Sequence, residues 1–411
     1  MVSLCLYFQV HQPFRLHKYR IFDIGQHSSY FNEELNKEVF LKVARNCYIP
    51  ANDILLKLIE QSNKNIKIAF SLSGTALEQM EKFAPFVLES FKELAKTGCV
   101  EFLSETYYHS LSFLYSRTEF KEQIELHRKA IQKHFGQTPL VFRNTELVYS
   151  NDVAHFLEQE GFKAVFAEGW EPILGKKSPN FLYRPIDAKA IKLFLKNYKL
   201  SDDIAFRFGD KHWEQYPLTP QKYVSWLDRS KNDDIVNLFM DYETFGEHQL
   251  EESGIFKFLR EMPLEALQKG HSFVTPSEAL EKFEVKAELD VPFLMSWADS
   301  SRDLSAWLGN KMQQESAREI FELEGEIKRS GDEQLLKDWR ALTSSDHFYY
   351  MCTKQTEDGV FHNYFCPYGT PYDSYVFFMN ALNDLIVRLK RKQDERVKEH
   401  SPLYEEEQLQ R

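Results

Sequence analysis

The sequence predicts an α/β barrel followed by a helical domain. Strand and helix patterns alternate from Met1 to about Lys286, which indicates parallel strands joined by crossover helices. About seven or eight strands over that length suit a sheet closed into a barrel. From Asp303 onward strand-like runs are scarce and the long stretches look helical. We therefore expect the barrel at 1–290 and the helical domain at 291–411.

Short apolar runs without a polar break give the expected strands. The first five are Ser3–Val10, Ile66–Leu72, Val100–Leu103, Leu140–Phe142 and Lys163–Ala167. Further apolar runs lie at Ile191–Leu195, Ile204–Phe208, Ile235–Met240 and Ser272–Val274. Pro13 follows the first run closely and should stop its ladder, because proline has no backbone N–H to donate.

Helices are expected between these runs and after them. In the barrel they are Asn32–Glu60 with a break at Pro50, Ala76–Lys96, Glu119–His134, Asp152–Gly161, Pro217–Ser230 and Gly254–Gln268. Gly98 is placed to end the second of these, as a C-terminal glycine often does. In the helical domain the expected helices are Asp303–Arg329, Asp332–Leu342 and Tyr372–Arg396.

Composition restricts the class of protein. The 411 residues are 43% hydrophobic and 27% charged, as in a soluble globular chain. The net charge of −11 at pH 7 argues against a nucleic-acid partner, because neutralising phosphates needs a basic surface. No run of 18 apolar residues occurs, so no membrane partner is expected. Five scattered cysteines without CxxC spacing indicate reduced thiols, and the N-terminus lacks a signal-peptide pattern, so we expect a cytoplasmic location.

Several expected strands end in ionisable residues. The run Ile235–Met240 delivers Asp241, with Glu243 two residues on and His248 after a glycine turn. Similar strand ends carry His11, the acids and His109 after Val100–Leu103, and Arg143 with Glu146. A single such acid is usually just an exposed carboxylate. Because catalytic residues of α/β barrels sit at the C-terminal ends of the strands, this repeated pattern predicts one polar active-site face.

Paired carboxylates with Trp and Tyr nearby are the side chains that glycoside hydrolases use for catalysis and for binding sugars. One carboxylate attacks the anomeric carbon, and the other protonates the leaving oxygen, which requires a raised pKa. A metal hydrolase could use His11, His109 and His248, yet no HxH or HExxH pattern is present. A binding module that keeps the acids only for hydrogen bonds is the other alternative. No GxSxG, P-loop or GxGxxG pattern supports an esterase, NTPase or dinucleotide enzyme.

Five segments, in this order, resemble the signature regions of glycoside hydrolase family 57. They are HQP at 11–13, GCVEFLSETYYH at 98–109, FRNTELVYS at 142–150, MDYETFGEH at 240–248 and SWADSSRDLSAWLGN at 296–310. The TEL and FGEH forms look most like the α-amylase branch. The resemblance implies a distorted (β/α)7 barrel whose mouth the helical domain helps to cover. It also implies a retaining hydrolase of α-1,4-glucans such as maltodextrin, starch or glycogen, working without a metal or other cofactor.

The resemblance also implies roles for individual residues. By motif position Glu146 is the nucleophile and Asp241 the general acid/base. Apart from the resemblance, Glu243 is a rival for the second role, because it lies two residues on and therefore on the same strand face. Substrate contacts are expected from His11, Glu101, His109, Arg143, Glu243, His248, Trp297, Asp303 and Trp307. Asp299 is an alternative to Asp303, which has the better spacing to Trp307. At Leu250 this branch often has Trp, so one aromatic subsite is expected to be missing.

Three functions remain open at this point. Hydrolysis and glucanotransfer, by a 4-α-glucanotransferase or a branching-type transglycosylase, share the glycosyl-enzyme intermediate. They differ only in whether water or a sugar hydroxyl intercepts it. The third is an α-glucan-binding protein without turnover. The sequence gives no prediction of the oligomeric state.

Overall fold

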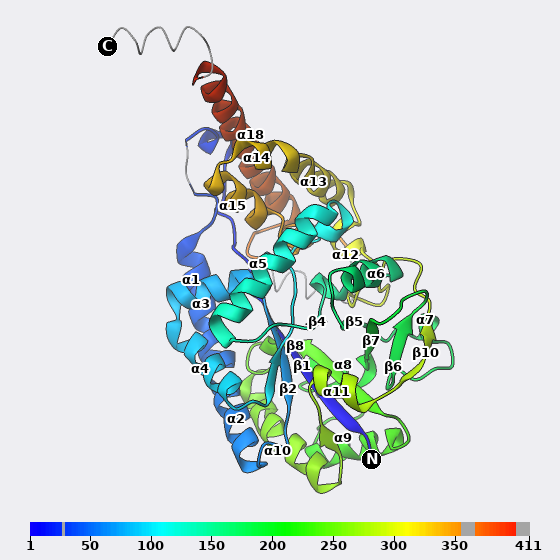
Figure 1. The fold of residues 1–411 in the computed structure, drawn as a ribbon. Helices are drawn as coiled ribbons and strands as arrows, with labels where there is room; N and C mark the ends of the chain where they lie inside the picture. Colours follow the sequence, from blue (N-terminus) through cyan, green and yellow to red (C-terminus); the bar gives the residue numbers. More distant parts are fainter. Residues whose placement is uncertain (27–28, 355–365, 400–411) are drawn as a thin grey trace. The chain divides into compact units, whose positions relative to one another are not determined.

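The computed structural model describes residues 1–26, 29–354 and 366–399, which fall into two compact units (Figure 1). The barrel unit consists of Met1–Gln12, Lys37–His109 and Phe120–Leu304. The helical unit consists of Pro13–Asn36, Ser110–Glu119 and Ser305–Arg411. The chain therefore passes between the units several times, whereas the sequence predicted one boundary at 290.

The difference from the predicted boundaries has specific causes. Residues 291–304 stay with the barrel unit because Met295 and Tyr149 exchange two backbone hydrogen bonds of 2.9 Å. Two earlier segments, Pro13–Asn36 and Ser110–Glu119, belong to the helical unit because side chains far along the sequence pair with them. The Tyr30 hydroxyl donates to Asp384 at 2.7 Å, and Arg340 pairs with Glu119 at 2.8 Å. Neither pairing is visible in local sequence patterns.

Within the described residues, seven parallel strands form the ring of the barrel. They are β1 (Ser3–Val10), β2 (Ile68–Leu72), β3 (Val100–Phe102), β4 (Val141–Phe142), β5 (Ala164–Glu168), β7 (Lys192–Lys196) and β8 (Ile235–Asp241). Regular ladders give the orders β3-β2-β1-β8 and β4-β5-β7. A single bridge, Ser104 to Phe142, joins β3 to β4, and Asn197 N donates to Asn237 O at 2.9 Å between β7 and β8. The predicted distorted (β/α)7 barrel is confirmed.

Three further strands lie outside this ring. β6 (Leu182–Pro185) pairs with β7 antiparallel, and β10 (Val285–Leu289) pairs with β6. Neither was predicted. β9 (Ser272–Phe273) pairs with the start of β1, close to the predicted run. The predicted strand Ile204–Phe208 is wrong: its residues end helix α8 (Tyr198–Ala205), which Asn197 caps by accepting from Leu200 N at 3.1 Å. A short apolar run fits a buried helix end as well as a strand.

Helices connect the strands along the chain (Figure 1). They are α1 (Glu33–Val43), α2 (Ile49–Gln61), α3 (Gly74–Phe83), α4 (Pro85–Lys96), α5 (Arg117–Phe135), α6 (Asn151–Gln159), α7 (Glu171–Leu174), α9 (Pro220–Leu227), α10 (Ile255–Gln268) and α11 (Pro276–Lys282). Pro50 does not break the first helical stretch. A π-helical turn, η2 (Ala44–Tyr48), leads into α2, and Pro50 lies in the first turn, where a missing N–H is harmless.

Alternate residues of β1 separate the two sides of the sheet. Leu4, Leu6 and Phe8 pack outward in the large core that includes the surrounding helices, whereas Cys5 and Tyr7 face the barrel interior. Inside, the rings of Phe166 and Phe239 stack at 4.2 Å and Tyr7 meets both edge-on. The interior of the barrel is therefore a packed core, in which a layer of aromatic rings lies beneath the C-terminal ends of the strands.

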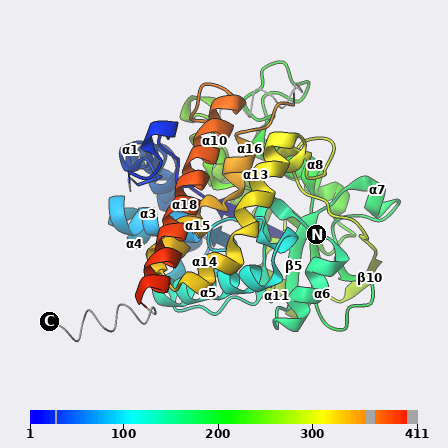
Figure 2. The same ribbon diagram turned by 90° about the horizontal axis from the view of Figure 1, so that it is seen from above.

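The helical unit holds the remaining helices of the described chain. They are α12 (Ser305–Leu308), α13 (Lys311–Glu322), α14 (Glu324–Ser330), α15 (Glu333–Leu342), α16 (Ser345–Tyr349) and α18 (Pro371–Glu399). Figure 2 shows α18 running beside α13, α14 and α15. The single helix predicted at Asp303–Arg329 is divided, because Asn310 caps a new helix start with Gln313. Among the described residues, none of the helices combines the length and the hydrophobicity that a membrane span requires.

Candidate active site

Polar side chains gather where the barrel strands end. Each strand of the ring is followed by, or ends in, a polar residue: His11 (β1), Ser73 (β2), Glu105 (β3), Arg143 (β4), Glu168 (β5), Lys196 (β7) and Asp241 (β8). Parallel strands of a closed barrel bring these ends to one rim. We call this set of strand ends the C-terminal rim.

Glu146 lies on the C-terminal rim in an unusual backbone conformation. It sits in the turn η4 (Thr145–Leu147) just after β4, with φ of 56°. His109 Nε2 lies 3.2 Å from one carboxylate oxygen, and the indole N–H of Trp297 donates to the other at 2.9 Å. A left-handed conformation is costly for a residue with a Cβ and persists where the surroundings impose it, often at functional sites. The turn therefore presents this carboxylate in a fixed orientation.

His109 is the main cation beside Glu146. Its Nδ1 lies 3.0 Å from Glu105, and its ring stacks on that of His11 at 3.9 Å. Burial alone would lower the pKa of His109, but the hydrogen bonds to Glu105 and Glu146 outweigh it and raise the pKa to about 9. The imidazole is therefore protonated at neutral pH and donates from both nitrogens.

The carboxyl groups of Glu146 and Asp241 are shifted in opposite directions. Burial would raise the pKa of Glu146, but the hydrogen bond from His109, with the charge of Arg143, lowers it below its ordinary value. Burial and the negative charge of Glu146 raise the pKa of Asp241 to about 6. Near neutrality one group is ionised while the other can still hold a proton. Two carboxyls whose environments separate their pKa values are suited to nucleophile and acid roles.

Glu243 lies beyond Asp241 in a buried hydrogen-bond group. The Tyr48 hydroxyl, from the π-helical turn η2, donates to its carboxyl group, and Gln12 Nε2 donates at 3.3 Å. Burial and the charge of Asp241 raise the pKa of Glu243 to about 8. Glu243 is therefore neutral near pH 7 and can support Asp241 without adding a second negative charge.

Cations and an indole complete the group around the two carboxyls. The guanidinium of Arg143 lies 4.6 Å from the ring centre of Trp297, and the ammonium of Lys196 lies 5.4 Å from it. Arg143 is fully buried, and none of its three guanidinium nitrogens makes a direct hydrogen bond to the described residues. These cations offset the negative charge of a carboxylate cluster that would otherwise repel itself.

Other predicted site residues lie elsewhere or take different roles. The carboxylate of Glu101 accepts from the backbone N–H and hydroxyl of Ser277 at 2.8 and 2.7 Å, at the start of α11. The structure therefore does not bring Glu101 to Glu146. Trp307 belongs to the helical unit, where it is buried 6.2 Å from the ring of Tyr349.

His248 and the two candidate aspartates complete the predicted set. Burial lowers the pKa of His248 to about 4, although the charge of Glu247 opposes this, so its imidazole is neutral. Asp303 is exposed, and its backbone carbonyl accepts from the Ser296 hydroxyl at 2.6 Å. Asp299 accepts from Ser301 N at 2.7 Å.

Sequence analysis missed a charged cluster on the same rim. Lys196 lies 2.9 Å from Asp202 and 3.7 Å from Glu168, and Arg302 lies 3.7 Å from each of these acids. Glu168 and Lys196 are paired in the ladder between β5 and β7. The rule applied to the other strands, a polar residue directly after an apolar run, would have found both, since they follow Ala167 and Leu195.

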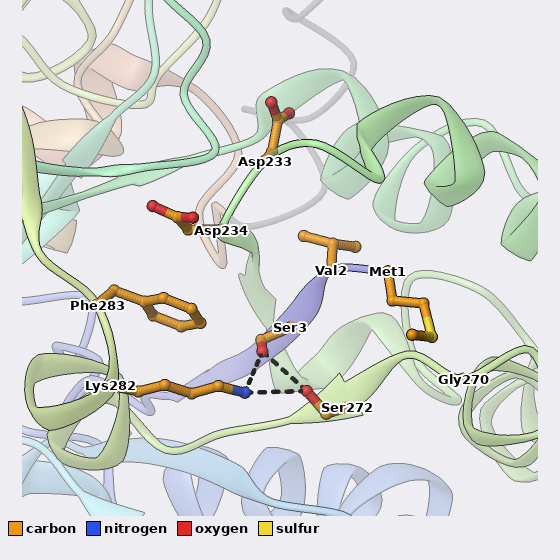
Figure 3. Close-up of a pocket in the computed structure, with 9 residues that line it drawn as sticks. All are labelled: Met1, Val2, Ser3, Asp233, Asp234, Gly270, Ser272, Lys282 and Phe283. Carbon is orange, nitrogen blue, oxygen red and sulfur yellow. Dashed lines mark hydrogen bonds between the residues drawn. The ribbon is translucent and has the colours of Figure 1, made fainter.

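A pocket of about 240 Å³ opens at the opposite end of the barrel strands, where β1, β8 and β9 begin (Figure 3). Three of its side chains bond one another: Lys282 donates to the hydroxyls of Ser3 and Ser272 at 2.9 and 3.4 Å. It contains neither the carboxyl pair nor the cations of the rim. Among the described residues, no group of three or more His, Cys, Asp or Glu side chains could hold a metal ion.

Comparison with known proteins identifies the family. The sequence model described as Glycosyl hydrolase family 57 matches residues 5–292. The chain belongs to this family. The membership predicted from the five sequence segments is confirmed, and the family 57 protein is a glycoside hydrolase.

Individual relatives agree with this family 57 assignment. A Methanocaldococcus jannaschii protein named "Putative alpha-amylase" is 44% identical over 400 residues, covering 93% of this chain and 84% of that protein. The structure is similar to a family 57 branching enzyme from Pyrococcus horikoshii, with a TM-score of 0.67, 18% identity and 88% of each chain covered. It is also similar to the 4-alpha-glucanotransferase from Thermococcus litoralis, with a TM-score of 0.64, 18% identity, and 84% of this chain and 56% of that one covered. At such identities the structural likeness shows the fold alone.

Proposed function

We propose that this family 57 enzyme is a retaining hydrolase of α-1,4-glucosidic bonds in maltodextrin, starch or glycogen, with Glu146 as nucleophile and Asp241 as general acid/base. The observation that carries the proposal is the pair of rim carboxyls with opposite pKa shifts, one held ionised by His109 and Trp297. The 44% identical relative named as an alpha-amylase supports the substrate class.

In the first step Asp241 donates its proton to the glycosidic oxygen as the bond to the anomeric carbon breaks. The Glu146 carboxylate forms a bond to that carbon and gives a glycosyl-enzyme ester. Its lowered pKa keeps it ionised for attack, and the raised pKa of Asp241 keeps the proton available.

In the second step the ionised Asp241 takes a proton from water, whose oxygen attacks the anomeric carbon and displaces Glu146. The configuration at that carbon is inverted twice and therefore retained. His109, which is charged beside the Glu146 carboxylate in the free enzyme, can stabilise that carboxylate again as it departs.

Residues around the carboxyl pair are proposed to bind the glucan. Arg143 and His11 can donate hydrogen bonds to sugar hydroxyls, and the ring of Trp297 can stack on a sugar face. Glu243 and His248, both held neutral by burial, can bond hydroxyls without adding charge. Further contacts from Asp303, and from the helical unit through Trp307, remain part of the proposal, as does a cytoplasmic location.

Product analysis on maltoheptaose tests the proposal, with the wild type beside Glu146→Gln. We expect the wild type to give only shorter maltodextrins and the variant to be inactive. Longer products from the wild type would instead establish transglycosylation, as in a 4-alpha-glucanotransferase or a branching enzyme, the names that two structural neighbours carry. Maltodextrin binding by calorimetry without any product would show a binding protein and overturn the catalytic roles.

A further inference from the structure

The segment Ser296–Asp303, here called the Trp297 loop, is closed at its base. Ser296 N donates to Arg302 O at 2.9 Å, and the Ser296 hydroxyl donates to Asp303 O at 2.6 Å. Asp299 and Arg302 both have left-handed backbone conformations, with φ of 39° and 51°. Two such residues in one short loop need outside contacts to hold them.

One side of the Trp297 loop is bound to the turn that carries Glu146. Trp297 N donates to Glu146 O at 3.3 Å, and its indole N–H donates to the Glu146 carboxylate at 2.9 Å. Just before the loop, Met295 and Tyr149 exchange two backbone hydrogen bonds. The position of the indole therefore determines one of the bonds that orient the proposed nucleophile.

The other side of the loop is bound to the barrel through Arg302. Its guanidinium donates to the carbonyl of Trp297 at 2.5 Å while lying 3.7 Å from Glu168 and 3.7 Å from Asp202. The same guanidinium lies 5.2 Å from the ring centre of Tyr198. One planar side chain thus joins the backbone of Trp297 to acids on β5 and α8.

Lys196 holds Glu168 and Asp202, the two acids that face Arg302, in place. Burial would lower the pKa of Lys196, but Asp202 and Glu168 raise it, so the ammonium is charged. Its contacts of 2.9 Å to Asp202 and 3.7 Å to Glu168 fix both acids that face Arg302. A guanidinium can bond a carbonyl and face two carboxylates at once because its five donors form a rigid fork, which a lysine ammonium cannot reproduce.

We propose that Arg302 is a positioning residue for the nucleophile. It holds the carbonyl of Trp297, and through it the indole that donates to Glu146, at the distance that keeps the carboxylate ionised and aimed at the anomeric carbon. This inference rests on the proposed function, since it assigns Arg302 to the same site. Arg302 does not touch the reacting atoms, so its effect passes through Trp297.

Steady-state kinetics on maltoheptaose test the proposal first, with Arg302→Met and Arg302→Lys. We expect kcat to fall by about 10- to 100-fold in Arg302→Met while KM changes little, because misplacing a reacting group costs rate more than binding. The acidic limb of the pH profile should move to higher pH, because Glu146 loses a donor that lowers its pKa. Arg302→Lys should recover only part of kcat. Arg184→Met is the matched control, since Arg184 pairs with Glu288 in an exposed contact on β6.

A double-mutant cycle tests whether the effect passes through Trp297. If it does, Trp297→Phe combined with Arg302→Met should be no slower than Trp297→Phe alone. If the losses of kcat from the two substitutions multiply in the double variant, the proposal is overturned. It is also overturned if the acidic limb of the pH profile does not shift in Arg302→Met. If Arg302→Met fails to fold, Arg302→Lys carries the same cycle.

The indole N–H signal in ¹⁵N-tryptophan NMR separates this inference from the proposed function. The Trp297 signal is identified by its loss in Trp297→Phe, and in the wild type it should titrate with Glu146. In Arg302→Met it should shift and stop following that titration, and in Arg302→Lys it should shift and follow the titration only in part. If the wild type cleaves no glucan but the signal behaves in this way, the proposed function fails and the positioning role stands. An unchanged signal in the Arg302 variants overturns the positioning role.

Discussion

The two ends of the barrel use polar residues in different ways. At the start of the strands, Glu101 is satisfied by Ser277, and Lys282 by the hydroxyls of Ser3 and Ser272. At the C-terminal rim, by contrast, His109 and Glu146 have left-handed backbones, and buried cations face carboxyls with shifted pKa values. The first end is arranged for stability, whereas the left-handed backbones and buried cations of the rim are typical of a functional site.

The largest expected effect of any single change is at Glu146. Glu146→Gln removes the nucleophile but keeps the shape of the side chain, so kcat should fall by about 10,000-fold or more. The melting temperature should change little. Glu101→Gln is the matched control, since it makes the same chemical change at the other end of the barrel and should leave kcat within about two-fold of the wild type. Equal losses of activity in both variants would remove the contrast between the two ends.

The second effect concerns Asp241. Asp241→Asn should lower kcat/KM by about 100- to 10,000-fold on unactivated maltodextrins, because no proton reaches the leaving oxygen. The loss of kcat/KM should be much smaller on a maltosyl fluoride, whose leaving group needs no proton. Equal losses of kcat/KM on both substrates would show that Asp241 is not the acid.

The same variant should be more stable than the wild type above neutral pH. The folded-state pKa of about 6 lies above the ordinary 3.8, so folding favours the protonated form. The stability contributed by this group is complete below about pH 4 and is lost as pH rises through 6. Thermal melts at pH 4.5 and pH 8 should therefore show that Asp241→Asn gains stability over the wild type only at the higher pH.

A third effect is the pH dependence of wild-type activity. kcat/KM should decline as pH rises above about 6, where free Asp241 loses its proton, and also at low pH, where Glu146 becomes protonated. On a maltosyl fluoride, whose leaving group needs no proton, this basic limb should disappear. A basic limb near pH 8 that persists with the fluoride would be assigned to Glu243, whose pKa is raised to about 8.

The smallest effects are expected at the start of the strands. Glu101→Gln should lower the free energy of unfolding by about 1 to 3 kcal/mol, since it weakens hydrogen bonds to a buried group. Lys282→Met should change it by less than about 0.5 kcal/mol, because the lysine is exposed. Urea unfolding measures both. A loss at Lys282 as large as that at Glu101 would mean that the pocket in Figure 3 contributes more to stability than its contacts suggest.

The sequence was most informative where one strand pattern repeats. An apolar run followed by ionisable residues correctly located β1, β3, β4 and β8, and with them His11, His109, Arg143, Glu146 and Asp241. The substrate contact predicted from Glu101 is wrong, because its side chain on β3 bonds to Ser277. Sequence patterns do not show toward which end of the barrel a strand side chain points. The cluster of Glu168, Lys196 and Arg302 joins Arg302 to two residues that lie more than 100 positions earlier in the chain. The assignment of Pro13–Asn36 and Ser110–Glu119 to the helical unit likewise depends on long-range contacts, which local sequence patterns do not contain.

Trapping the glycosyl-enzyme tests the central claim most directly. Asp241→Asn should react with α-maltotriosyl fluoride, because fluoride leaves without a proton, and should then hydrolyse the ester slowly because the general base is absent. Mass spectrometry of the intact protein should show the added maltotriosyl group, and peptide mapping should place it on Glu146. An adduct on another residue, or substrate consumed without any adduct, would contradict the assignment of Glu146 as the nucleophile.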